Sequence, residues 1–160
     1  MLTIAILIYA AALTLANLSV VHFGPASIPF NAFVLIGLDL ALRNWLALKM
    51  NAFQMLALIA VAATLSWVLN PESGRIAAAS FGAFSLSALA DWATFRTVRG
   101  AWLRRCLGGV TVGAAVDSIA FPLLAGFSLA YAPVLFAAKV AGGALWAWVL
   151  SRRMIDKAAA

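Results

Sequence analysis

Three of the five acidic residues in this chain, Asp39, Asp91 and Asp117, lie inside long apolar segments. A carboxylate at the centre of a bilayer costs about 2.5–3.5 kcal/mol even on scales that give low penalties. Such a group is therefore expected to face a partner or a polar cavity rather than lipid. Packing alone explains one such residue, but three on separate segments indicate a polar site inside a bundle of helices.

The composition predicts an all-α integral membrane protein. Of the 160 residues, 66% are hydrophobic and only 10% are charged, which is typical of a chain that crosses a bilayer several times. A spanning helix needs about 20 residues, so the chain has room for about six spans with short loops. We expect a six-transmembrane-helix bundle that forms one integral membrane domain over residues 1–160, with spans at 2–21, 31–46, 53–69, 76–94, 107–124 and 128–150. The first span has no basic N-terminal region, so we expect a retained helix rather than a signal peptide.

The basic residues predict the orientation of this bundle. The formal net charge is +6. Apart from Arg75 and Lys139, the Lys and Arg residues lie at the end of, or after, the second, fourth and sixth expected spans, which places them on one side. The opposite loops offer only Arg75, offset by Glu72. By the positive-inside rule, both termini are expected in the cytoplasm. We expect the membrane that holds the helices to be the bacterial inner membrane. The rule accounts for the positive charge without a nucleic-acid partner.

Helical spacing predicts an ion pair in the second span. Asn31, Leu35, Asp39 and Arg43 follow one another at four-residue steps and are expected to form one stripe. In that register Asp39 and Arg43 can pair, which lowers the cost of placing either in the membrane. The pair is either a structural contact that closes one end of the helix or a part of a substrate site.

Two later spans each place a carboxylate on a face of small, polar and aromatic residues. The expected faces are Ser80, Phe84, Ser87 and Asp91, and then Gly109, Gly113, Asp117 and Phe121. The glycine pair is a small-xxx-small motif that favours close helix packing. We expect Asp117 to contribute most to binding or coupling, because it lies nearer mid-span. Asp91 either joins the site or pairs with Arg96 or Arg99 at the membrane surface.

Four further residues have two interpretations each. Lys139 is the natural counter-charge for one of the carboxylates, in a structural or a switchable pair. Asn17 either recognises a polar ligand or makes a hydrogen bond between helices. His22 is expected to be interfacial rather than a metal ligand, and Cys106 to be a bystander thiol rather than a palmitoylation site.

The sequence lacks the motifs that several kinds of enzyme and metal site require. The chain contains no GxxxxGK[ST] phosphate loop, no HExxH, no cysteine pair and no GxSxG elbow. We therefore expect no enzymatic activity, no catalytic residues, no cofactor and no bound metal.

Four segments occur in the order seen in the vitamin-uptake-transporter-like family: ANLSVVHFGP, FNAFVLIGLDLALRNWL, ASFGAFSLSALADWATFR and GAAVDSIAFPLLAG. The chain resembles this family over most of its length. The most specific elements are the D-x-x-x-R of Asp39 and Arg43, the S-F-x-A-F before Asp91, and the V-D-S around Asp117. The third and sixth spans match only in hydropathy, and the chain is shorter than the usual members.

The resemblance implies a fold and a substrate. Characterised members import queuosine precursors, the 7-deazaguanines, and their bundle is similar to the substrate-binding subunits of energy-coupling-factor vitamin importers. Those subunits need a separate ATPase, whereas members of this family are thought to work without one. Proton coupling through Asp117 or Asp91 is compatible with that difference.

A 7-deazaguanine would use the polar and aromatic residues named above. Its N1–H and exocyclic amine are adjacent donors that a carboxylate can accept, and its flat ring stacks on aromatic side chains, for which Phe33 and Trp92 are further candidates. The expected substrate-binding residues are Asn17, Asn31, Asp39, Phe84, Asp91, Asp117 and Phe121.

Other functions stay open at this point. The expected partners are a purine-like small molecule and the lipid bilayer, and a homo-oligomer is compatible with the sequence. One alternative function is a vitamin-binding subunit that depends on an external ATPase. The other is a non-transporting membrane adaptor whose aspartates serve only helix packing.

Overall fold

The computed structural model describes residues 2–158, and nearly all of them are helical. The α-helices are α1 (Leu2–Phe23), α2 (Ile28–Asn31), α3 (Gly37–Leu46), α4 (Ala52–Leu69), α5 (Gly74–Thr97), α6 (Trp102–Ala125) and α7 (Ala132–Ala158). Short 3-10 turns precede α2, α5 and α7 at Pro25–Ser27, Pro71–Ser73 and Leu129–Tyr131. A π-helical turn, Ala32–Ile36, joins α2 to α3, so that these pieces make one irregular helix. The described residues therefore form six long helices, over the segments where the sequence predicts them.

Five of these helical segments in the described part of the chain are long and apolar enough to cross a membrane. They are Leu2–Phe23, Ala52–Leu69, Pro71–Thr97, Trp102–Ala125 and Leu129–Arg152. Many large apolar side chains on them point outward, among them Leu7, Trp67 and Leu123. This is the surface expected of a helical bundle that lies in lipid. The α2–α3 helix is the exception, because its shorter apolar stretch carries buried Asp39 and Arg43.

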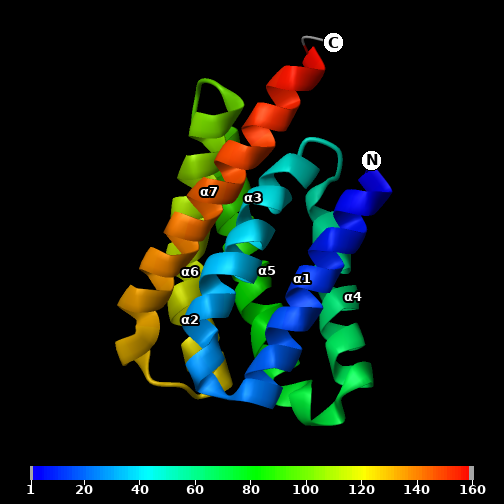
Figure 1. The fold of residues 1–160 in the computed structure, drawn as a ribbon, viewed down its shortest axis with the longest axis vertical. Helices are drawn as coiled ribbons and strands as arrows, with labels where there is room; N and C mark the ends of the chain where they lie inside the picture. Colours follow the sequence, from blue (N-terminus) through cyan, green and yellow to red (C-terminus); the bar gives the residue numbers. More distant parts are fainter. Residues whose placement is uncertain (1, 159–160) are drawn as a thin grey trace.

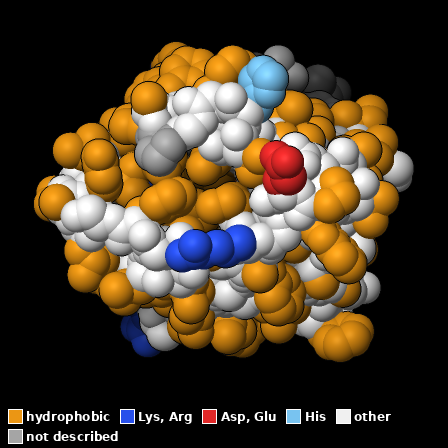
Figure 2. All heavy atoms as spheres, turned by 90° about the horizontal axis from the view of Figure 1, so that it is seen from below, with side chains coloured by type: hydrophobic (Ala, Val, Ile, Leu, Met, Phe, Trp, Pro, Cys, Tyr) orange, Lys and Arg blue, Asp and Glu red, His pale blue; other side chains and the backbone are white. Residues whose placement is uncertain are grey.

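The helices run up and down the long axis of the molecule, and both ends of the chain lie at the same end of the bundle (Figure 1). The α3–α4 and α5–α6 loops lie at that end too, with the exposed Lys49 and Arg99. The opposite end, seen in Figure 2, is mostly hydrophobic with few charged side chains. The basic loops therefore share one end, as the charge pattern predicts, whereas the side of the membrane that this end faces stays a prediction.

Local signals in the sequence set several helix ends. At the start of α4, Asn51 Oδ1 accepts from the backbone N–H of Gln54 at 2.9 Å, and Gln54 Oε1 accepts from the backbone N–H of Asn51 at 2.9 Å. This reciprocal capping box provides acceptors for two backbone N–H groups that have no partner within the helix. Helix α6 ends at Ala125 and is capped by Gly126, whose φ of 73° is left-handed and suits glycine.

Glycines allow the closest helix contacts, as the small-xxx-small motif predicts. A Cβ on Gly109 of α6 would lie 2.0 Å from Asp91 Oδ1 of α5, and one on Gly113 would lie 3.2 Å from Asp91 Cβ. A Cβ on Gly142 of α7 would lie 1.9 Å from the carbonyl oxygen of Phe33 in the π turn. These contacts bring α6 against α5, and α7 against the π turn.

Candidate functional site

A cavity of about 30 Å³ lies between α1, α2, α5, α6 and α7, in the half of the bundle away from the chain ends. We call it the Asp117 cavity. Five residues that the sequence predicts to bind substrate line it, together with Lys139: Asn17, Asn31, Phe84, Asp117 and Phe121. The remaining lining is mainly small and apolar, from Ala16, Val20, Ala32 and Ile36 among others. The fold thus gathers residues that are more than a hundred positions apart, such as Asn17 and Lys139, into one mixed polar and aromatic site.

Asp117 and Lys139 form a buried ion pair in this cavity. Lys139 Nζ lies 2.5 Å from Asp117 Oδ2, and the two side chains are 3% and 2% exposed. The prediction that Lys139 neutralises one of the carboxylates is confirmed. The other carboxylate oxygen, Asp117 Oδ1, is buried and has no hydrogen-bond partner among the described residues. A buried acceptor without a donor is unfavourable, so this oxygen is suited to accept from a ligand.

The two asparagines of the cavity also connect helices. Asn17 Nδ2 donates to Ser66 Oγ at 3.1 Å, and Asn17 Oδ1 accepts from Ser80 Oγ at 2.6 Å. Asn31 Nδ2 donates to Ser19 Oγ at 2.6 Å. The interhelical hydrogen bond expected of Asn17 is therefore present, joining α1 to α4 and α5. A bound ligand would have to share or exchange these contacts.

Two phenylalanines form the aromatic walls of the cavity. Phe84 is 4% exposed and Phe121 is 9% exposed, and Phe121 makes an edge contact with Phe127. The further stacking candidates lie elsewhere. Phe33 faces the outside of the bundle, 38% exposed, and Trp92 belongs to a different cavity.

The Asp39–Arg43 ion pair predicted from the four-residue spacing is present and fully buried. Arg43 Nη2 donates to Asp39 Oδ2, while Arg43 Nη1 donates to Ser87 Oγ at 3.1 Å. Ser87 Oγ in turn donates to the Gly113 carbonyl at 2.9 Å. We call this set the central layer, because it joins α3, α5 and α6 one helical turn from Asp117. Asp39 belongs to the central layer and does not line the Asp117 cavity.

The expected stripe of Asn31, Leu35, Asp39 and Arg43 is wrong in one respect. The π turn over Ala32–Ile36 adds a residue to the helical repeat and rotates the rest of the helix about its axis. As a result Ile36, and not Leu35, lines the Asp117 cavity beside Asn31. Asn31 and Asp39 therefore contribute to different sites, although four-residue spacing places them on one face.

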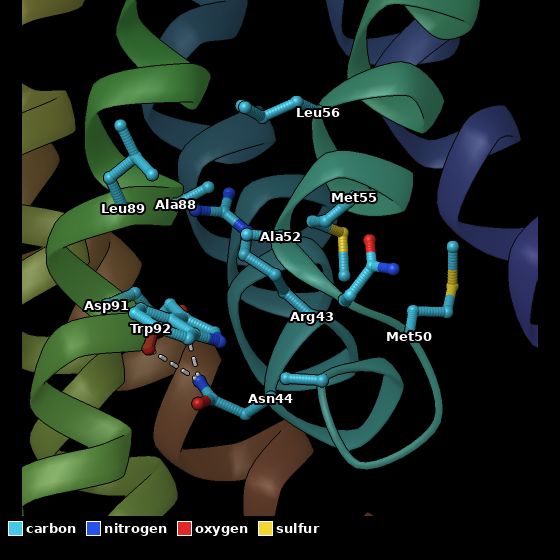
Figure 3. A pocket seen from close by; sticks show the side chains of 12 residues that line it. Arg43, Asn44, Met50, Ala52, Met55, Leu56, Ala88, Leu89, Asp91 and Trp92 are labelled. Atoms are coloured by element: carbon cyan, nitrogen blue, oxygen red, sulfur yellow. Dashed lines mark hydrogen bonds between the residues drawn. The ribbon is translucent and has the colours of Figure 1, made fainter.

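Asp91 occupies a second cavity, of about 20 Å³, near the α3–α4 loop (Figure 3). Asn44 Nδ2 donates to Asp91 Oδ1 at 2.9 Å and lies 3.1 Å from Oδ2. Arg43, Met55 and Trp92 also line this Asp91 cavity. The substrate-binding residues expected to form one site are thus divided between two cavities and the layer between them.

The alternative that Asp91 pairs with Arg96 or Arg99 at the surface is wrong. Asp91 is only 1% exposed, whereas both arginines are exposed. Arg96 lies five residues on, which places it off the face of Asp91, and its guanidinium sits over the Trp92 ring at 5.2 Å. Asp117 and Asp91 are equally buried, each 1% exposed. The expectation that Asp117 lies nearer mid-span and contributes most to binding stays a prediction.

Sequence reasoning missed Asn44 and Ser66, which bind Asp91 and Asn17. Each partner is almost fifty residues away, so no local spacing connects them. The one available signal was an amide or hydroxyl in the middle of an apolar segment. Of the other residues, Cys106 is fully buried, which removes it from palmitoylation, and His22 is exposed at the end of α1.

Comparisons of the chain with protein-family models, with curated proteins and with solved structures found no match.

Proposed function

We propose that the chain is a transporter of the bacterial cytoplasmic membrane that imports a purine-like solute, 7-cyano-7-deazaguanine or a related 7-deazaguanine. The observation that carries the proposal is the free oxygen of Asp117, buried in a cavity between two phenylalanine walls. The resemblance of four segments to the vitamin-uptake-transporter-like family supplies the substrate class.

The Asp117 cavity has the groups that a 7-deazaguanine requires. Asp117 Oδ1 accepts from the N1–H or the exocyclic amine, which are adjacent donors on the ring. Lys139 holds the other carboxylate oxygen and has further N–H bonds to donate to the ring carbonyl. Phe84 and Phe121 supply the flat apolar contacts.

Binding requires the bundle to open. A cavity of about 30 Å³ holds one or two water molecules and not a purine ring. The cavity lies toward the end that the positive-inside rule places outside the cell, which suits uptake. The central layer blocks the way to the other end, so transport needs the two ends to open in turn around the site, as in other secondary transporters.

The proposal is tested by rescue of tRNA modification. Cells that neither make nor import queuosine precursors should regain queuosine-modified tRNA when they express this chain and receive 7-cyano-7-deazaguanine. Asp117→Asn should abolish the rescue, and Glu72→Gln, the same type of change at an exposed position, should leave it intact. Wild-type protein that reaches the membrane but gives no modified tRNA would refute the proposal.

Uptake into liposomes separates this function from the alternatives. Purified protein should move the labelled substrate across a lipid bilayer without ATP or any second protein. Uptake that appears only when an ATPase module is added would indicate a vitamin-binding subunit. Absence of binding and of uptake would favour the adaptor.

A further inference from the structure

The described core contains more buried carboxylates than buried cations. Asp39, Asp91 and Asp117 are all buried, whereas Arg43 and Lys139 are the only buried ones among the basic residues whose side chains the structure describes. Each cation is already paired, Arg43 with Asp39 and Lys139 with Asp117. In the described part of the chain, no Lys or Arg nitrogen lies within 4 Å of Asp91. One buried carboxylate is therefore left with neutral partners alone.

The groups around Asp91 do not compensate its charge. On α3, the amide of Asn44 donates from a single nitrogen to both oxygens. On α6, Gly109 packs against Oδ1, and the neighbouring thiol of Cys106 is buried. The α4 wall of the cavity is apolar at Ala52, Met55 and Leu56, with the Asn51 amide at its end.

The nearby cations are engaged elsewhere. Arg105 of α6 donates from Nε to the Phe95 carbonyl at 3.0 Å, and its guanidinium lies 4.1 Å from the Phe95 ring centroid. On α5 itself, Arg96 is exposed over Trp92. Arg43 lines the Asp91 cavity but donates to Asp39 and Ser87 of the central layer. An ionised carboxylate that is buried without a counter-charge costs several kcal/mol, and a bound proton removes that cost.

We propose that Asp91 is the site that binds the coupling proton, and that its protonation decides whether Arg43 stays in the central layer. The proposal rests on the proposed transport function for its role and on this geometry for its position. The Asp91 cavity has room for one water molecule, through which a proton reaches a carboxylate oxygen from the α3–α4 end.

The central layer provides the link from the proton to the substrate. With the proton bound, Asp91 is neutral and Arg43 pairs with Asp39, as observed. When the proton leaves, the negative charge of Asp91 attracts Arg43, which already lines that cavity and whose Nε has no partner among the described residues. Movement of Arg43 toward Asp91 breaks its hydrogen bond to Ser87 and opens the layer that separates the two cavities.

The first test needs no substrate. Infrared spectra of the purified protein in lipid, recorded across a pH series, should show the carbonyl stretching band of a protonated, buried carboxyl group that disappears at alkaline pH. Asp91→Asn should lack this band, and Glu72→Gln should keep it. Asp91→Asn is expected to fold, because its amide oxygen still accepts from Asn44 and the change leaves no buried cation unpaired. An unchanged band in Asp91→Asn would overturn the proposal.

A second variant keeps the test decisive if Asp91→Asn fails to fold. Asn44→Leu removes the donor to both Asp91 oxygens and should change the pH at which the band disappears. Asn31→Leu makes the same change in the Asp117 cavity and should leave that pH unaltered. Equal behaviour of the two variants would place the titrating group away from Asp91.

Transport measurements then test the coupling. In liposomes, Asp91→Asn should still exchange labelled for unlabelled 7-cyano-7-deazaguanine, but should lose the accumulation driven by an inward proton gradient. Accumulation by Asp91→Asn at the wild-type level, or accumulation that depends on a sodium gradient instead, would overturn the coupling role. Absence of exchange in the wild type would refute the transport function, while the infrared result would still decide the proton site.

Discussion

Three aspartates of equal burial differ in their partners. Among the described residues, Asp39 pairs with a guanidinium and Asp117 with an ammonium, whereas Asp91 accepts only from an amide. A buried charge is tolerated when it is paired and hydrogen-bonded, so the partner decides what each carboxylate can do. Asp39 and Asp117 each have one carboxylate oxygen without a hydrogen-bond partner among the described residues. Of these two residues, only Asp117 lines a cavity in which a ligand can reach that oxygen.

At Asp117, replacement of the carboxylate by an amide should weaken substrate binding. Asp117→Asn replaces one acceptor oxygen with a donor NH₂, which opposes the donors of a guanine-like ring. The loss of a charge-assisted hydrogen bond should cost about 1.5–3 kcal/mol, or roughly ten- to a hundredfold in affinity. The measurement is binding of 7-cyano-7-deazaguanine by purified protein.

The control for this variant addresses folding, because Asp117→Asn leaves Lys139 as a buried, unpaired cation. The double variant Asp117→Asn with Lys139→Met removes both charges and should recover folded yield without recovering affinity. Wild-type affinity in either variant would reduce Asp117 to a packing residue.

Within the central layer, loss of either member of the Asp39–Arg43 pair should lower the yield of folded protein. Each single change leaves one buried charge unpaired, a penalty of about 3–5 kcal/mol. The exchanged pair, Asp39→Arg with Arg43→Asp, should recover part of the yield, measured as monodisperse protein after solubilisation. Ser87→Ala keeps the ion pair but removes the hydrogen bond from Arg43 and the one to the Gly113 carbonyl, and should cost about 1–3 kcal/mol. Normal yield of both single variants would show that the pair is solvated or absent in the membrane.

At the scale of the element, the α2–α3 helix is the irregular member of the bundle. Its π turn interrupts the regular hydrogen bonding of backbone carbonyls in an α-helix. Trp146 Nε1 of α7 donates to one of the carbonyls in this turn, that of Val34, at 3.1 Å. Gly142 of α7 lies directly against this turn. The turn and α7 therefore hold each other in place, beside the Asp117 cavity.

A larger residue at Gly142 should separate α7 from the π turn. In Gly142→Ala the Cβ would lie 1.9 Å from the backbone oxygen of Phe33, which cannot move aside as a side chain can. Overpacking of this kind costs about 1–3 kcal/mol or more, and the effect should appear as a lower thermal unfolding temperature. Gly108→Ala is the matched control, since the atoms nearest to its Cβ belong to side chains, with a methyl of Val98 at 3.3 Å and one of Thr94 at 3.6 Å. Equal stability of the two variants would contradict the close contact.

At the scale of the whole molecule, the bundle has one basic end and one end with few charges. Both ends of the chain lie at the basic end (Figure 1), and the exterior between the two ends is rich in large apolar side chains. The Asp91 cavity lies toward the basic end and the Asp117 cavity toward the other, with the central layer between them. The orientation of the bundle in the membrane therefore decides which cavity lies toward the outside of the cell and which lies toward the cytoplasm.

Cysteine labelling should show the basic end in the cytoplasm. In a Cys106→Ala background, single cysteines at Ala26 and Glu72 should react with a membrane-impermeant reagent added to intact cells, and one at Arg99 should react only after permeabilisation. The three positions are exposed. Ser73, in the same loop as Glu72, is not suitable for labelling, because it is fully buried and donates to the Ser66 carbonyl. The reverse labelling pattern would show that the bundle has the opposite orientation, with the Asp117 cavity toward the cytoplasm.

The sequence by itself determined the features that depend on neighbours along the chain. The helical segments follow from apolar length, and the Asp39–Arg43 pair follows from a four-residue step within one helix. The buried faces that contain Asp91 and Asp117 follow from the same periodicity.

Only the tertiary structure decided which helices supply the partners. Lys139 pairs with Asp117 and Asn44 binds Asp91 because of how the helices rotate and slide against one another, set by glycine contacts far apart in the chain. The π turn that brought Ile36 to the cavity in place of Leu35 also has no local signal. It is held by Trp146 and Gly142 of α7, and a repeat of 3.6 residues read along one segment contains no information about that contact.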